Sequence, residues 1–197
     1  MMNTTDQSLD LLELVVLAMC REPKQLRTIV DRSPGALIVS FEANPADTKR
    51  LVGAQGSMIH SLSNLFRLLM RRDRSVNPRI DQMIPNGKQE SFALQSHEPF
   101  PTERFENLLR RIGEHIFQVP VTITTRDGHG AMHMTMRIEQ EKLDEQTARG
   151  LGRCVLDIFS SAGQNHGRRL NVQVCGAYER TAELRSGAVA GSHTPAR

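Results

Sequence analysis

The sequence predicts an α+β protein made of two tandem copies of one α-β-β-α-α-β module, each a three-stranded sheet packed on helices. Two observations lead to this fold class. Helical and alternating apolar periodicities follow one another in the same order in both halves of the 197-residue chain. Between the halves, residues 85–101 are polar, contain three prolines and show no period, as expected for a linker.

The first module, residues 9–84, follows a polar N-terminus at 1–8 that is expected to be frayed. Asn44-Pro45 supplies an N-cap and a proline at the first helical position of the fourth element. Pro78 confines the last strand to a sheet edge or an irregular piece. The expected elements are a helix at 9–19, strands at 26–31 and 36–42, helices at 45–51 and 57–74, and a strand at 76–84.

The second module, residues 102–176, repeats this plan. Gly150-Leu151-Gly152 is expected to separate a short charged helix from a longer one. The expected elements cover residues 103–116, 119–123, 132–138, 142–149, 153–162 and 170–174. Residues 177–197, rich in small residues and arginine, are expected to be a disordered tail.

A single offset of 97 residues aligns landmarks of the two halves, which favours an ancient duplication. It places Phe41 on Ile138, Asp47 on Asp144, Gly53 on Gly150 and Arg71-Arg72 on Arg168-Arg169.

The tetrapeptide Gly53-Ala54-Gln55-Gly56 predicts a helix-loop-helix elbow with an uncovered backbone. Glycine lacks a Cβ, so it adopts positive φ and lies against a ligand without a clash. The loop amides and the first N–H groups of the helix that starts at Ser57 make a concavity suited to phosphate. The same pattern also occurs in ordinary turns, so its meaning depends on the surrounding elements.

Composition permits an anionic partner without demanding one. The chain has 25 Lys and Arg against 22 Asp and Glu, a net charge of +3 and a pI of about 9.0. Cys20, Cys154 and Cys175 are too scattered for a disulfide framework or a metal knuckle, which favours the reducing cytoplasm. No apolar run reaches the ~20 residues of a bilayer span, so no membrane contact is expected.

The first module resembles a K-homology domain of type II topology, and in particular the small bacterial single-domain K-homology RNA-binding proteins. The stretch from Asn44 to Leu62 carries the resemblance, because a short helix, a hydrophobic-Gly-x-x-Gly loop and a second helix follow a strand there. The likeness covers residues 9–70, and beyond Val119 it extends only to the order of the elements.

The resemblance implies a groove between the loop and a neighbouring strand that holds about four nucleotides of single-stranded RNA or DNA. Carried over by position, the backbone clamp is Gly53, Ala54, Gln55 and Gly56. Lys49 and Arg50 are the nearby phosphate partners, and Ser57 and His60 are candidates for the groove wall. The family commonly has a cation inside the loop, which is neutral here, so a weaker affinity is expected. In the second module Arg153 stands where the second glycine would, so that copy is expected to be degenerate.

No group of residues argues for catalysis or a cofactor. His129 and His133 flank the second hairpin but lack a third ligand of suitable spacing, so no metal site is expected. Cys154 stands near an expected helix start, where a helix dipole lowers a thiol pKa. Without a histidine partner it is interpreted as a half-buried structural cysteine. The alternating Met132, Met134 and Met136 are interpreted as core residues.

These interpretations lead to a non-enzymatic, cytoplasmic single-stranded RNA-binding protein, with single-stranded DNA left open as a ligand. The competing hypothesis is a protein-interaction or assembly module that keeps the K-homology fold without binding nucleic acid. The neutral loop, the small net charge and the degenerate second copy favour it. A protein partner or a homodimer is left open under either hypothesis.

Overall fold

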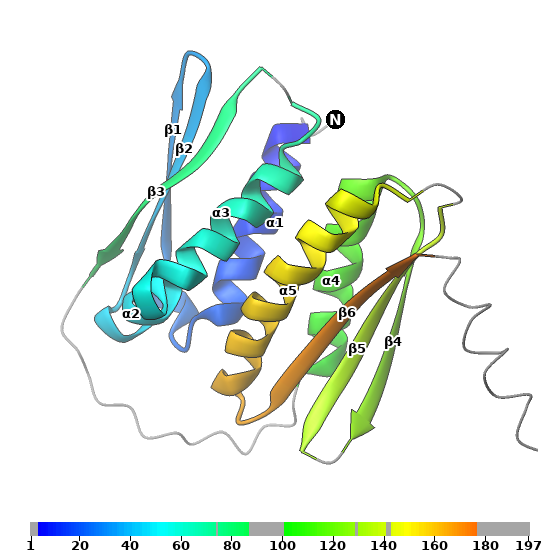
Figure 1. Ribbon diagram of the computed structural model, residues 1–197. Coiled ribbons are helices and arrows are strands. Elements are labelled where there is room, and N and C mark those ends of the chain that lie inside the picture. The colour runs from blue at the N-terminus through cyan, green and yellow to red at the C-terminus, as the bar shows by residue number, and fades with distance from the viewer. Residues whose placement is uncertain (1–3, 74, 87–100, 129, 141–142, 177–197) are drawn as a thin grey trace, which may run out of the picture.

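The computed structural model describes residues 4–73, 75–86, 101–128, 130–140 and 143–176 (Figure 1). The first half contains α1 (Thr4–Met19), η1 (Pro23–Gln25), β1 (Arg27–Ser33), β2 (Ala36–Ala43), α2 (Pro45–Val52), η2 (Ala54–Gly56), α3 (Ser57–Leu69) and β3 (Asn77–Pro85). The second half contains α4 (Thr102–Phe117), β4 (Val121–Gly128), β5 (Ala131–Ile138), α5 (Glu145–Asn165) and β6 (Arg169–Gly176). The α+β class is confirmed.

Each half contains one three-stranded mixed sheet, and both sheets have the same topology. In the first sheet, β2 lies in the centre, antiparallel to β1 and parallel to β3. In the second, β5 is antiparallel to β4 and parallel to β6. The predicted edge position of the strand with Pro78 is confirmed because β3 is an outer strand, and an outer strand tolerates a residue without an N–H.

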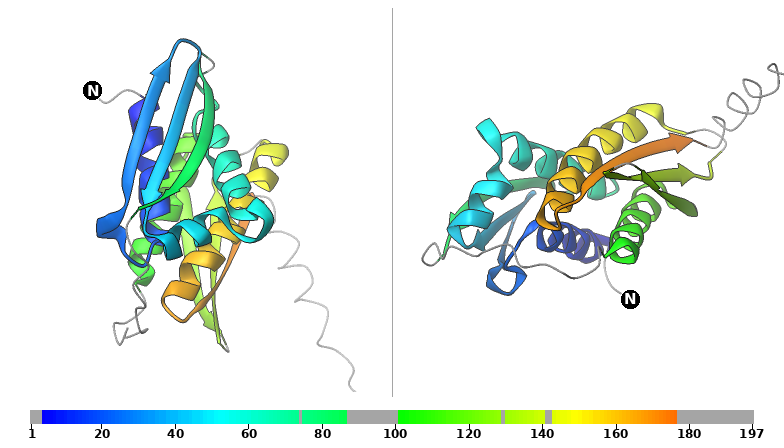
Figure 2. Two further views of the ribbon diagram at one scale, coloured as in Figure 1. Left: turned by 90° about the vertical axis from the view of Figure 1, so that its left-hand side faces the viewer. Right: turned by 90° about the horizontal axis from the view of Figure 1, so that it is seen from below.

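The helices α1, α3, α4 and α5 form a layer between the two sheets (Figure 1). The first sheet stands in front of this layer in the left view of Figure 2. Helices of the two halves contact each other directly, α1 with α4 and α5, and α3 with α4 and α5. Buried apolar side chains of both halves form a single core. The two modules are therefore packed as one unit.

The two hairpins correspond at an offset of 95 residues, which corrects the offset of 97 in this part of the chain. The turn glycines Gly35 and Gly130 have nearly equal φ values of 77° and 79°. At this offset the buried residues Leu37, Val39, Phe41 and Ala43 of β2 match Met132, Met134, Met136 and Ile138 of β5. The two offsets differ by two residues, and side chains of a strand alternate with a period of two, so either offset aligns buried residues with buried residues. Only the position of the turn shows which alignment of the two hairpins is right. The core position of the methionines is confirmed.

The two helices expected at the end of the second half are one continuous helix, so the predicted helix break was wrong there and the order is α-β-β-α-β. The helix α5 passes through Gly150 and Gly152, and neither has a positive φ. A Cβ at Gly150 would lie 3.9 Å from Leu68 Cδ1, and one at Gly152 would lie 3.8 Å from Val174. A helical glycine costs about 1 kcal/mol relative to alanine, and packing on α3 and β6 outweighs that cost here.

The first helix begins at Thr4, five residues before the start that the periodicity predicts, so residues 4–8 are not frayed. The Thr5 hydroxyl donates to the Asp73 carboxylate at 2.6 Å, and the Ser8 hydroxyl donates to the Leu69 carbonyl at 3.0 Å. Both side chains are buried. Polar contacts, which apolar periodicity does not reveal, therefore hold this turn.

The expected linker overlaps the end of β3 and the residue before α4. Its central residues 87–100 and the C-terminal segment 177–197 lie outside the described residues.

Candidate nucleic-acid interface

The elbow Gly53–Gly56 turns the chain sharply between α2 and α3. Gly53 has φ 74° and ψ 176°, Gln55 has φ 53° and ψ 28°, and Gly56 has φ 78° and ψ 11°. The helix-loop-helix elbow predicted from the two glycines is present, and Gln55 shares the left-handed conformation with Gly56.

Gly53 cannot be replaced without strain. A Cβ at this position would lie 2.7 Å from the Cβ and 2.8 Å from the backbone nitrogen of Met58. Its combination of positive φ and extended ψ is also essentially restricted to glycine. The close approach of Gly53 to the first turn of α3 therefore fixes the shape of the elbow.

Two backbone hydrogen bonds hold the elbow. The N–H of Gly53 donates to the Lys49 carbonyl at 3.0 Å, and the N–H of Gly56 donates to the Gly53 carbonyl at 3.3 Å. Between them, Ala54 and Gln55 are exposed. They stand before the N-terminus of α3, where the helix dipole favours an anion.

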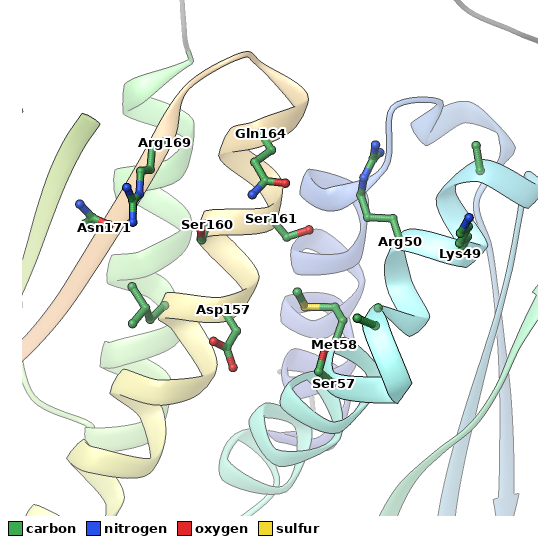
Figure 3. Close-up of a pocket in the computed structure, with 14 residues that line it drawn as sticks. Lys49, Arg50, Ser57, Met58, Asp157, Ser160, Ser161, Gln164, Arg169 and Asn171 are labelled. Carbon is green, nitrogen blue, oxygen red and sulfur yellow. The ribbon is translucent and has the colours of Figure 1, made fainter. Parts of the chain in front are cut away.

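The elbow forms one side of a groove of about 820 Å³ between the two modules, which we call the elbow groove. Its other parts are the C-terminal half of α5 and the start of β6, as the side chains in Figure 3 show. The lining residues used below are Lys49, Arg50, Gly53, Ala54, Ser57 and Met58 of the first module, and Leu156, Asp157, Ser160, Gln164, Arg169 and Asn171 of the second.

Cations outnumber carboxylates along the elbow groove. Lys49, Arg50 and Arg169 line it, against the single carboxylate of Asp157. That carboxylate accepts a hydrogen bond from the Ser61 hydroxyl at 2.7 Å. The excess of positive charge, contributed by both modules, suits an anionic ligand.

The buried carboxylate of Asp47 holds Arg50 in place. Asp47 is 1% exposed and accepts hydrogen bonds from the N–H groups of Arg21 (3.0 Å) and Glu22 (3.1 Å), from the Asn44 amide (2.8 Å) and from Arg50 Nη1 (3.2 Å). Burial, and then the charge of Arg21, lowers the pKa of Arg50, while Asp47 opposes this shift. Arg50 is thus a positioned charge at the edge of the groove.

The elbow groove also offers apolar surface. Leu156 of α5 is 41% exposed, which is unusual for a leucine in this protein, and Met58 of α3 is half-buried. Apolar side chains next to cationic side chains suit a ligand that combines flat apolar rings with an anionic backbone.

Five of the eight residues that the resemblance singles out meet in this groove, namely Lys49, Arg50, Gly53, Ala54 and Ser57. Gln55, Gly56 and the exposed His60 lie outside its lining. The opposite side comes from Ser160, Gln164, Arg169 and Asn171, which sequence reasoning missed because it expected a strand of the first module there. The only earlier signal was the alignment of Arg168-Arg169 with Arg71-Arg72.

Cys154 is a buried residue in the middle of α5, not near a helix start. Burial, reinforced by the charge of Asp157, raises the pKa of Cys154 to about 11. The thiol is therefore protonated near neutral pH, and its interpretation as a structural cysteine is confirmed.

In the part of the chain that the structure describes, no three His, Cys, Asp or Glu side chains gather in a way that could hold a metal ion. His133 is exposed, and His129 lies outside the described residues.

Among the helices that the described ranges contain, none combines the length and the apolarity needed to cross a bilayer. No protein-family model matches the chain, and no curated protein matches it.

Proposed function

We propose that the chain is a non-enzymatic single-stranded RNA-binding protein that holds the nucleic-acid backbone at the Gly53–Gly56 elbow. The observation that carries this proposal is the exposed glycine elbow before the N-terminus of α3, beside a groove in which Lys49, Arg50 and Arg169 outnumber the one carboxylate of Asp157. A phosphate accepts from backbone N–H groups at the N-terminus of α3, and a base lies against Leu156 or Met58.

The cations of the groove add a second, salt-sensitive contribution. Lys49 and Arg50 precede the elbow, and Arg169 of β6 lines the same groove. Each neutralised phosphate of a single strand adds ~0.7 to the slope of log affinity against log salt. Because the loop side chains are neutral, the backbone amides replace the loop cation that the K-homology resemblance leads one to expect.

The alternative is a protein-interaction module that keeps the fold without binding nucleic acid. The observation that favours it is the outer strand β1, on which Ile29 and Val30 are 45% and 37% exposed. An outer strand with exposed apolar side chains is a surface on which another chain can pair. A protein that binds no RNA and self-associates through β1 would support this alternative.

The test is a titration of short labelled RNAs with the wild type and with Ala54→Asp/Gln55→Asp, which places two negative charges where a phosphate would lie. We expect this variant to lose affinity at least about tenfold, since both the repulsion and the lost counterion release oppose binding. Fluorescence anisotropy at two salt concentrations measures the affinity and its salt slope.

The matched control is Ala54→Asn/Gln55→Asn, which has almost the same shape without the charge. Asn tolerates the left-handed conformation of Gln55, so we expect binding within about twofold of the wild type. Equal affinity of the Asp and Asn variants would show that no phosphate lies at the elbow.

A further inference from the structure

A second groove lies at the other end of the α3–α5 helix pair. It has a volume of about 940 Å³, and three arginines line it, Arg67 of α3 and Arg149 and Arg153 of α5; we call it the arginine groove. The two helices are antiparallel, because Ser61 meets Asp157 while Leu68 lies beside Gly150. The same two helices therefore build the elbow groove at one end and the arginine groove at the other.

The two grooves lie on one face of α5. The residues of α5 that line them include a series that recurs every three or four positions, at Gln146, Arg149, Arg153, Asp157, Ser160 and Gln164. Residues at this spacing share one side of a helix. On α3, Ser57 of the elbow groove and Arg67 of the arginine groove are about 15 Å apart along the helix axis. The grooves are thus successive parts of one furrow.

The three guanidinium groups are accessible to an anion. All three arginines are exposed. Arg67 Nη1 donates to the Asn64 amide oxygen at 3.1 Å, and Arg149 pairs with Glu145 at 3.0 Å, with both side chains more than 70% exposed. Exposed ion pairs contribute little, so a phosphate can replace Glu145 at small cost. Arg153 forms no ion pair within the described residues.

The arginine groove contains side-chain donors instead of an elbow. The segment α2–elbow–α3 spans residues 45–69, whereas α5 spans residues 145–165, and the four-residue difference equals the length of the elbow. A continuous helix has no unpaired amides in its middle. Guanidinium groups, by contrast, bind phosphate oxygens through two parallel hydrogen bonds.

We propose that the arginine groove binds the phosphate backbone of the same RNA strand that the elbow clamps, through Arg67 and Arg153 with help from Arg149. This inference rests on the proposed function of the elbow. A strand of about four nucleotides fills a K-homology clamp, so only a longer strand reaches both grooves. The module that lacks an elbow thus extends the binding site.

The experiment compares a 4-nucleotide and a 12-nucleotide single-stranded RNA on the full-length wild type and on Arg67→Ala/Arg153→Ala. For the 12-mer we expect the variant to bind about tenfold more weakly and the salt slope to fall by ~1.4, which corresponds to two lost phosphate contacts. Binding of the 4-mer should not change. The control Arg110→Ala/Arg126→Ala removes the same charge outside both grooves, and Arg110 makes the same contact with Asn107 (3.0 Å) that Arg67 makes with Asn64.

The outcomes separate the two proposals. If the 12-mer binds equally to the wild type and to the arginine-groove variant, or if the control variant loses as much affinity for it, the arginine groove is not a phosphate site. The elbow is still supported in that case if the Ala54→Asp/Gln55→Asp variant loses affinity for both RNAs. If the wild type binds neither RNA, both proposals fail.

Discussion

Asp47 links three parts of the first module through one carboxylate. It accepts hydrogen bonds from the segment after α1, from the N-cap of α2 and from Arg50. The sequence marked Asp47 only as a landmark of the repeat, because two of its partners are backbone amides of Arg21 and Glu22 that approach it only after folding. In the structure Asn44, not Asp47, is the counterpart of Asp144, since both are N-caps that accept from the amide three residues later.

Replacement of Gly53 by alanine should destabilise the protein more than the same change at a glycine with open space. We expect Gly53→Ala to lower the free energy of unfolding by about 3 kcal/mol, because the new Cβ meets Met58 and the backbone conformation is restricted to glycine. The matched control is Gly35→Ala, at φ 77° with nothing within 4 Å of the Cβ, for which about 1 kcal/mol is expected. Denaturant titration measures both values, and equal losses would exclude the contact with Met58 as the cause.

A buried polar cluster joins three helices of the central layer. His115 of α4 has Nε2 2.8 Å from the Ser8 hydroxyl of α1 and 3.1 Å from the Leu69 carbonyl at the end of α3. Burial lowers the pKa of His115 from its usual value, the charge of Arg72 adds to this effect, and the Leu69 carbonyl opposes it. The folded protein therefore favours the neutral imidazole.

This histidine should make stability fall in mild acid. The unfolded chain takes up a proton near pH 6.5, whereas the folded chain does so only at lower pH, so the stabilisation is complete above pH 6.5 and is lost as the pH falls toward the lowered pKa. We expect the melting temperature to drop by at least about 2 °C between pH 7.5 and 5.5. In His115→Gln this drop should shrink, and in the control His60→Gln, at an exposed position, it should persist. If the melting temperature of His115→Gln falls with pH as much as that of the wild type, other groups cause the loss of stability.

Apolar periodicity was sufficient to predict the strands and most helices. The alternation of Met132, Met134 and Met136 predicted both the strand and its buried face. The periodicity was insufficient for α5, because Gly150 and Gly152 have the composition of a loop, and the packing of α5 on α3 and β6 is not visible in the sequence. The same limit applies to the elbow groove: its glycines were visible in the sequence, but Arg169 and Asn171 approach them only through packing between the halves.

At the scale of the molecule, the helix layer belongs to both halves. Besides the contacts of Ser8 and His115, the Asn165 amide of α5 donates to the Met19 carbonyl at 2.5 Å, and Ser61 of α3 donates to Asp157. The sequence predicted two modules from their repeated order of elements. It did not predict the shared core, because periodicity identifies an apolar helix face but not the element that covers it.

The first module should therefore not fold alone. A fragment of residues 1–86 exposes the faces of α1 and α3 that pack on α4 and α5 in the full chain. We expect it to lack a cooperative thermal transition by circular dichroism under conditions in which the full chain melts sharply, since the lost burial exceeds the few kcal/mol by which small domains are stable. A sharp transition of the fragment would show that each module has a sufficient core of its own.

The second half lacks the four residues of the elbow, and this difference between the halves affects the direction in which a strand can lie across them. Two identical halves related by a two-fold axis would present the same site twice, and a strand lying across them would bind equally well in either orientation. In this chain one end of the furrow has the glycine elbow and the other has three arginines. If both proposals hold, a strand bound across the two ends has a fixed polarity, with its 5′ end at one groove and its 3′ end at the other.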